Sequence, residues 1–233
     1  DCRCQPRHVI HDCATLGRLI DLTHRKRDPS DAAVARDLPF GITPYYVSLM
    51  DRQTDRARDH AVRAQVIPTL DYVDGVRQAV AAAQADEDPL ACLDYMGEAD
   101  TSPIDLITRR YPQIAVLKPF NTCAQMCVYC QRNWEVREVM DPAAMAGRDK
   151  LDAAINWIAD NPGLQEILVT GGDPLLMAEE RLDWILGRLA AIPHIQRIRI
   201  GSRLPVGLPM RVTVNLLPLF ARHQKPRDPV GQK

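Results

Sequence analysis

Between residues 114 and 200, short apolar runs alternate with longer amphipathic stretches, and this alternation limits the possible folds most strongly. The apolar runs have the length of buried strands, whereas the amphipathic stretches are long enough for helices. Strand, helix and strand in succession are typical of a parallel sheet covered by helices. The pattern therefore predicts an α/β fold, with strands at 114–117, 167–169 and 195–200 and helices at 151–158 and 181–190.

A polar segment follows each of the three predicted strands. Cys123-Ala-Gln-Met-Cys127-Val-Tyr-Cys130 follows the first, Gly171-Gly172-Asp173-Pro174 the second and Gly201-Ser202-Arg203 the third. The carboxyl ends of parallel strands meet at one edge of a sheet, where reactive groups gather. We therefore expect a functional site at this edge.

The remaining sequence favours helices before this sheet and little order after it. Apolar residues at helical spacing predict a helix over 71–85, and a short helix is expected from Ser30 or Asp31 to Ala35. Another short helix is expected around residues 104–107, and a further element at Val212 and Val214. The expected organisation is a mainly helical N-terminal region at 1–108, an α/β domain at 109–215 and an irregular tail at 216–233. The buried face of the 71–85 helix would carry Val73, Val76, Val80 and Ala83.

Charge and composition exclude several classes of partner. Lys and Arg number 29 and Asp and Glu 30, which gives no electrostatic reason to expect a nucleic acid or an anionic membrane. No apolar run approaches the roughly 20 residues that span a bilayer, and the first residues lack a secretory signal. We expect a cytoplasmic protein.

The spacing of Cys123, Cys127 and Cys130 favours an iron–sulfur cluster. Seven cysteines are an odd and unevenly placed set, unlike a secreted disulfide framework. Three thiolates on one loop can hold three irons of a [4Fe–4S] cluster and leave the fourth iron open. A structural zinc site usually has four protein ligands, and no fourth Cys or His lies close behind Cys130. A zinc site, and a coincidental trio of buried cysteines, are therefore the weaker alternatives.

The cysteine loop resembles the motif of the radical S-adenosylmethionine superfamily, in which an aromatic residue, here Tyr129, precedes the last cysteine. The resemblance implies that the open iron binds S-adenosylmethionine, whose one-electron cleavage yields a 5′-deoxyadenosyl radical. Gly171 and Gly172 let the backbone approach a ligand closely, and their carbonyls and Asp173 could accept bonds from an ammonium group. A tight turn capping the next helix is the alternative for this segment. Its position after a strand resembles the superfamily's methionine-amino-binding element.

A narrower resemblance covers roughly residues 40–215. Its motifs are Ile42-Thr-Pro-Tyr-Tyr46, Arg110-Tyr111-Pro112, the cysteine loop, Thr170-Gly-Gly-Asp-Pro-Leu175 and Ile198-Arg-Ile-Gly-Ser-Arg203 with Leu208-Pro209. Their order is similar to that of the lysine 2,3-aminomutase (KamA) family. The resemblance implies a partial (β/α) TIM-like barrel and an isomerase that moves an amino group between positions 2 and 3 of an amino acid such as lysine. It also implies pyridoxal phosphate and a reductant such as flavodoxin or ferredoxin.

The same resemblance assigns roles to individual residues. Arg132 matches an arginine that binds the substrate carboxylate, for which a bidentate guanidinium is suited. Arg110 and Tyr111 match residues near pyridoxal phosphate, and Arg203 would face the same cavity as a cofactor-binding residue. Outside the motifs, each arginine would be read as a surface residue. No catalytic residue is assigned.

The chain departs from the family pattern at three places. Ile114 stands where the family usually has a phosphate-binding arginine, and Gln131-Arg132-Asn133 replaces Thr-Arg-Arg. The expected Schiff-base lysine would lie beyond Lys233, so we expect a truncated product or a fragment. Two alternatives stay open: a radical S-adenosylmethionine enzyme without pyridoxal phosphate, and a cluster-binding remnant without activity. Substrate identity and homo-oligomer formation are left open.

Overall fold

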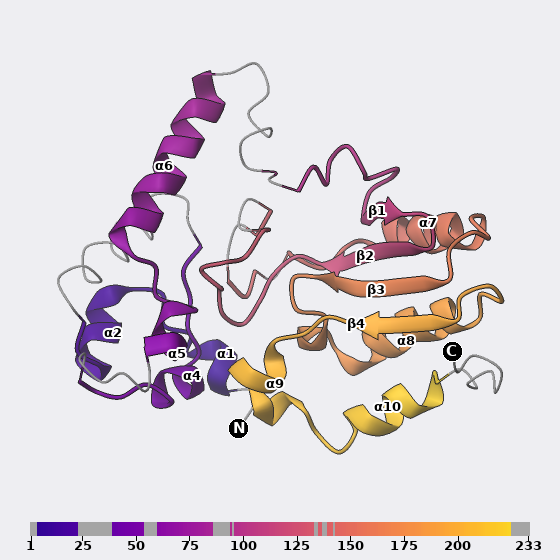
Figure 1. The fold of residues 1–233 in the computed structure, drawn as a ribbon. Helices are drawn as coiled ribbons and strands as arrows, with labels where there is room; N and C mark the ends of the chain where they lie inside the picture. Colours follow the sequence, from indigo (N-terminus) through magenta and orange to yellow (C-terminus); the bar gives the residue numbers. More distant parts are fainter. Residues whose placement is uncertain are drawn as a thin grey trace, which may run out of the picture.

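The computed structural model describes residues 4–22, 39–53, 60–85, 94, 96–132, 135–136, 139–141 and 143–224. A sheet with helices behind it occupies one side of the molecule, and a group of short helices lies beside it (Figure 1). Within the described ranges, no helix combines the length and apolar character that crossing a membrane requires.

The sheet contains four strands in the order β1-β2-β3-β4. β2 (Ile114–Phe120), β3 (Glu166–Gly171) and β4 (Arg197–Ile200) are mutually parallel, and β1 (Ile107–Tyr111) runs antiparallel to β2. The predicted α/β class and its three predicted strands are therefore confirmed. The sheet is open, and its four strands do not close into a barrel.

Alternation along β2 decides which face of the sheet carries the core. Ala115 and Leu117 are buried, whereas the side chains between them lie on the other face and are less covered. α7 (Arg148–Ala159) and α8 (Glu179–Ala190) pack on the buried face, as the predicted helices should (Figure 1). The helices contribute to this core Leu151, Ile155, Ile158, Leu182, Ile185 and Leu189.

The expected helix around residues 104–107 is wrong. Ile107 begins β1, and Leu106 just before it has a φ of 67°, a left-handed conformation that no helix can contain. The apolar spacing of Ile104, Leu106 and Ile107 resembles a helical turn, but Ile107 is buried against the sheet core instead. The segment is too short to distinguish the helical period of about 3.6 residues from the strand period of about 2 residues.

The described part of the N-terminal region contains five helices, four of them short, and a hydrophobic core of its own. They are α1 (Cys4–Arg7), α2 (Cys13–Leu19), α4 (Pro44–Ser48), α5 (His60–Ala64) and the longer α6 (Leu70–Ala85). Their core is centred on Leu16, Ile42, Tyr46 and Ile67. The helix expected at residues 30–35 lies outside the described residues.

Along α6, Val73 is buried and Val76 is half-buried, as the helical spacing predicts. The side chains of Val80 and Ala83, which were expected on the same face, lie outside what the structure describes.

After β4 the chain forms short helical turns rather than a further strand. α9 (Leu204–Gly207) and the 3-10 turn η2 (Pro209–Arg211) precede α10 (Leu216–Arg222). Val212 and Val214, where another element was expected, lie between η2 and α10 and are exposed. Residues 216–222, expected to be irregular, are helical because Leu216 and Leu219 reach the core of the sheet.

Candidate functional site: the cysteine loop

The cysteine loop leaves the carboxyl end of β2, at the edge where the sequence predicts a site. Cys123, Cys127 and Cys130 are partly buried and form no disulfide. The backbone N–H of Cys130 donates to the carbonyl of Cys127 at 3.1 Å, so the last two cysteines share one tight turn. The three thiols are therefore carried by one short loop.

The N-terminal helical region holds this loop on both sides of Cys127. The N–H of Met126 donates to the carbonyl of Gly41 at 2.9 Å, and that of Val128 to the carbonyl of Gln65 at 2.9 Å. These contacts could not be predicted from the sequence, because the partners lie far apart along the chain. The conformation of the loop thus depends on the N-terminal region.

The Gly171-Gly172 segment packs against the stretch that leads into Cys123. Gly171 has a φ of 108°, which side chains rarely adopt. The N–H of Gly172 donates to Phe120 at 2.6 Å and that of Asp173 to Thr122 at 2.9 Å. The two glycines thus allow a close approach to the protein's own backbone, and their approach to a ligand stays a prediction.

This contact leaves no room for a side chain at Gly172. A Cβ there would lie 2.7 Å from the carbonyl carbon of Thr122 and closer still to its N and O atoms. We expect Gly172→Ala to lower the free energy of unfolding by about 3 kcal/mol, because the backbone must shift to relieve the overlap. The matched control is Gly75→Ala in α6, which meets no atom within 4 Å and should stabilise the helix by about 1 kcal/mol. Urea denaturation of both variants tests this, and equal effects would contradict it.

The Asp173 carboxylate is occupied within the protein. It is 5% exposed and accepts bonds from the Ser202 hydroxyl at 2.8 Å and from the backbone N–H groups of Arg203 (2.7 Å), Leu204 (3.0 Å) and Leu175 (3.1 Å). Burial raises the pKa of this carboxyl, although these bonds act in the opposite direction. The carboxylate thus anchors the loop after β4, and the backbone of the glycines is the better candidate for contact with a ligand.

Arg203 connects that loop to Cys127. Its guanidinium donates to the Cys127 sulfur, to the Gln65 side-chain carbonyl and, at 3.3 Å, to the Tyr46 hydroxyl. It also lies over two aromatic rings, 5.6 Å from the centre of Tyr46 and 5.5 Å from that of Tyr129. Burial is the largest single influence and acts to lower the pKa of Arg203, but the charge and hydrogen bond of Cys127, together with Tyr129 and Tyr46, outweigh it, so the pKa lies above its ordinary value. The expected gathering of Arg203 and Tyr129 at the cysteine loop is present.

The donor set suits a metal cluster chemically. Burial, followed by the charges of Asp173 and the other two thiols, raises the pKa of Cys123 to about 12, and burial also raises the pKa of Cys130. A bound cationic metal would offset both effects, because thiolates are the ligands it takes. Within the described ranges, no three His, Cys, Asp or Glu side chains already converge on one point.

Arg132 belongs to a cluster of four charges that the sequence did not predict. Its guanidinium pairs with Glu98 at 2.5 Å and with Glu135, and Lys118 of β2 pairs with the same two carboxylates at 3.3 and 3.2 Å. Burial, with Arg132 next in importance, lowers the pKa of Lys118. The Nε atom of Arg132 is buried and has no hydrogen-bond partner among the described residues.

A polar cavity of about 920 Å³ adjoins this cluster. Lys118 and Glu135 line it together with Asn121, Asp141 and the exposed ion pair of Lys150. It lies beside the carboxyl end of β2, and neither the three cysteines nor Arg132 belong to its lining. A zwitterionic ligand would find charges of both signs there.

Arg110 and Tyr111 are not brought to this site. Both are exposed at the end of β1, where Tyr111 pairs with Ile114, the first residue of β2. The cysteine loop follows the last residue of β2. Arg110 and Tyr111 therefore lie beside one end of β2, and the cysteine loop lies at the other end. Their role in binding pyridoxal phosphate stays a prediction that this arrangement does not support.

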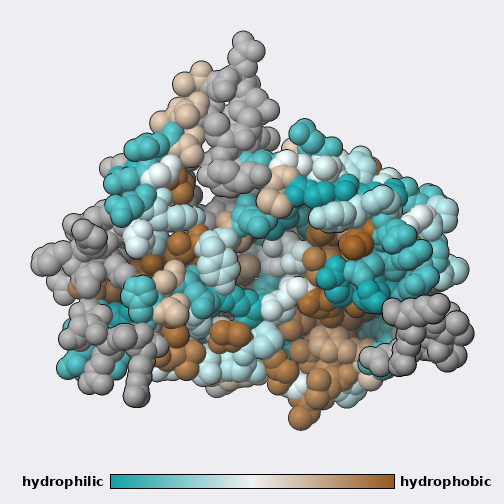
Figure 2. Space-filling view, in the orientation of Figure 1, coloured by the Kyte–Doolittle hydropathy of each residue, from teal (hydrophilic) through white to brown (hydrophobic). Residues whose placement is uncertain are grey.

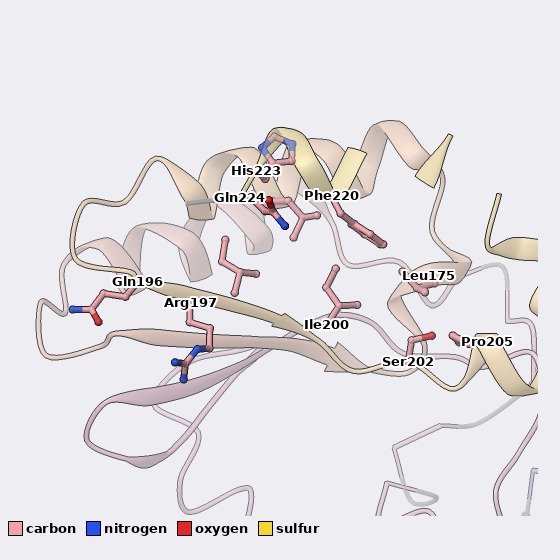
Figure 3. Close-up of a pocket in the computed structure, with 11 residues that line it drawn as sticks. Leu175, Gln196, Arg197, Ile200, Ser202, Pro205, Phe220, His223 and Gln224 are labelled. Atoms are coloured by element: carbon pink, nitrogen blue, oxygen red, sulfur yellow. The ribbon is translucent and has the colours of Figure 1, made fainter. Parts of the chain in front are cut away.

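A second hollow, of about 510 Å³, lies between β4, α8 and α10 (Figure 3). Ile198, Ile200, Leu186 and Phe220 line it, and apolar surface gathers around α10 in the space-filling view (Figure 2). Its lining includes none of the predicted cluster or substrate residues. It lies on the sheet's helical side, and two of its lining residues, Leu175 and Ser202, bind the Asp173 carboxylate.

Comparison with known proteins agrees with the motifs. No family model matches the chain. An uncharacterized KamA family protein of Methanocaldococcus jannaschii is 43% identical over 84% of this chain, and 30% of that protein is aligned. The L-lysine 2,3-aminomutase of Clostridium subterminale is 34% identical over 96% of the chain and 49% of its own length. The glutamate 2,3-aminomutase of Clostridioides difficile is 32% identical over 88% and 44%.

The chain thus spans less than half the length of each of these three relatives, while nearly all of it aligns with the two aminomutases. Relatives acting on two different amino acids align at similar identity, so the comparison does not select a substrate. Over most of its length, this chain is a homologue of the 2,3-aminomutases and is placed in the KamA family.

Proposed function

We propose that this chain is the cluster-binding part of a radical S-adenosylmethionine isomerase that moves an amino group on an amino acid such as lysine. The observation that carries the proposal is the cysteine loop: three thiols follow the carboxyl end of β2, Gly171-Gly172 packs against the stretch leading into Cys123, and Arg203 contacts Cys127. The similarity to lysine and glutamate 2,3-aminomutases supports the reaction class. A partial TIM-like barrel, a cytoplasmic location and a flavodoxin or ferredoxin as reductant belong to the same proposal.

The cysteines and the two glycines have different roles in this proposal. Cys123, Cys127 and Cys130 would hold three irons, and the backbone of Gly171 and Gly172 would lie beside the methionine group. When bound, the cluster and S-adenosylmethionine supply a 5′-deoxyadenosyl radical. The tight packing of Gly172 on the loop backbone fixes the spacing between the two binding elements.

Arg132 is the proposed contact for the substrate carboxylate. Its unpartnered Nε atom can donate one bond, and its Nη atoms are shared with Glu98 and Glu135. Lys118 pairs with the same two carboxylates, so each of them keeps a cationic partner when Arg132 turns toward a substrate carboxylate, although the cluster then carries one net negative charge. The adjoining polar cavity offers space for an amino acid.

A second candidate function keeps the radical chemistry and omits pyridoxal phosphate. The position of Arg110 and Tyr111 favours it, because these residues lie beside the first residue of β2, whereas the cysteine loop follows its last residue. The two candidates would be distinguished in a longer protein that also contains the part of the relatives to which this chain does not align. The absorbance of an internal aldimine in that protein would indicate pyridoxal phosphate.

The proposal is tested by anaerobic reconstitution of the chain with iron and sulfide. We expect about four irons per chain and a charge-transfer absorbance that dithionite bleaches. Addition of S-adenosylmethionine to the reduced protein should then yield 5′-deoxyadenosine, measured by chromatography. A protein that holds four irons but releases no 5′-deoxyadenosine would contradict the enzymatic proposal and favour the cluster-binding remnant.

A further inference from the structure

Arg203 joins the N-terminal helical core to one of the three cysteines. The hydroxyl of Tyr46, one of its partners, donates to the carbonyl of Val62 at 3.2 Å, and the side chain is 2% exposed in the core of the helical region. Gln65, the other partner, uses its backbone carbonyl to hold Val128 of the cysteine loop. Tyr46 and Gln65 are therefore both held in place by contacts that do not involve Arg203.

The charge of Arg203 is directed at sulfur. In the part of the chain that the structure describes, no aspartate or glutamate forms an ion pair with its guanidinium, and Asp173 accepts only from its backbone N–H. Arg132, by contrast, is paired with two carboxylates. Arg203 thus places an uncompensated positive charge and a hydrogen bond on Cys127, whereas the charge of Arg132 is balanced.

A cation beside a ligand thiolate changes the energies of the two redox states unequally. Reduction adds one electron to the cluster, and the attraction to a neighbouring positive charge grows with the negative charge of the cluster. Hydrogen bonds to cluster sulfurs act in the same direction. Partial burial of Cys127 and Arg203 reduces the screening of this effect by water.

We propose that Arg203, positioned by Tyr46 and Gln65, raises the reduction potential of the cluster held at Cys127, so that the N-terminal helical region sets the ease of the first electron transfer. The inference rests on the proposed function, because it needs a cluster on the three cysteines. Tyr46 and Gln65, which position Arg203, both belong to the N-terminal helical region rather than to the cysteine loop.

The test is a potentiometric titration of the reconstituted protein, poised with dithionite and mediators and followed by electron paramagnetic resonance. Arg203→Gln should lower the ratio of reduced to oxidised cluster about tenfold at a fixed potential, which corresponds to about 59 mV for one electron. Arg203→Lys, which keeps the charge, should lie closer to the unmodified protein. Tyr46→Phe and Gln65→Leu should shift the ratio in the same direction by less.

The matched control is Arg197→Gln, which removes an exposed arginine at the other end of β4 and should leave the midpoint unchanged. An unchanged midpoint in Arg203→Gln, at the iron content of the unmodified protein, overturns the inference and leaves the proposed function intact. If Arg203→Gln fails to fold, unchanged midpoints in both Arg203→Lys and Tyr46→Phe overturn it instead. An unmodified protein that binds no iron refutes the proposed function itself.

Discussion

Each of the three single variants Cys123→Ser, Cys127→Ser and Cys130→Ser should abolish 5′-deoxyadenosine formation and reduce bound iron to well below about four per chain. A [4Fe–4S] cluster with three protein ligands loses a corner when one thiolate is removed, and no other cysteine of the loop can replace it. Serine keeps the size and the hydrogen-bonding capacity of the side chain, so the fold should survive. Iron analysis, visible absorbance and product formation on reduced protein provide the measurements.

Cys13 offers the matched control. It is a buried thiol in α2, within the core of the N-terminal helices and away from the loop. Cys13→Ala should cost about 1 kcal/mol of stability and leave iron content and 5′-deoxyadenosine formation unchanged. If one of the three loop variants retained full iron and activity, that cysteine would not be a ligand, and a C-x3-C-x2-C cradle would be the wrong description of this site.

The sheet could be predicted because its parallel strands contain short, continuous apolar runs separated by amphipathic helices. In β2 and β3 these runs are residues 114–117 and 167–169, and Ala115, Leu117, Ile167 and Val169 from them are buried in the core. β1 was not predicted, because its sequence holds two consecutive arginines followed by an exposed tyrosine. A short edge strand that buries only its first residues has no such apolar run.

The motifs predicted that the segments after β2, β3 and β4 meet, but Arg110 and Tyr111 lie elsewhere, and the motifs did not show what each residue touches. Asp173 was expected to meet a ligand ammonium group, yet its oxygens are occupied by the loop that carries Arg203. Arg132 was expected to await a carboxylate from the substrate, and two carboxylates of the protein already flank it. Hydrogen-bond partners depend on tertiary contacts that a motif in one segment does not contain.

The contribution of the N-terminal helices was not predictable from local patterns. Gly41, Tyr46 and Gln65 meet the cysteine loop and Arg203 across long separations along the chain. A hint was present, because Tyr46 lies in a motif shared with the family for which the sequence suggested no role. The structure gives it one, by placing its hydroxyl and ring against the guanidinium that touches Cys127.

Asp173→Ala should be the most destabilising substitution at the site. The change leaves the buried N–H groups of Leu175, Arg203 and Leu204 without their acceptor, and each unsatisfied donor costs about 1–3 kcal/mol. Because the loop can relax, we expect a total loss of about 3–5 kcal/mol in the free energy of unfolding. Asp173→Asn keeps one acceptor oxygen and should cost roughly half as much. Urea denaturation of the unreconstituted chain measures both.

The comparison that isolates burial is Asp105→Ala, which removes an exposed carboxylate whose ion pair with Lys150 should be worth less than about 1 kcal/mol. A loss in Asp173→Ala no larger than this would show that the carboxylate does not anchor the loop. Because the same carboxylate fixes the backbone of Arg203, Asp173→Asn should also lower the cluster midpoint in the direction of Arg203→Gln. A destabilised variant with an unchanged midpoint would separate the anchoring of the loop from the placement of the guanidinium on Cys127.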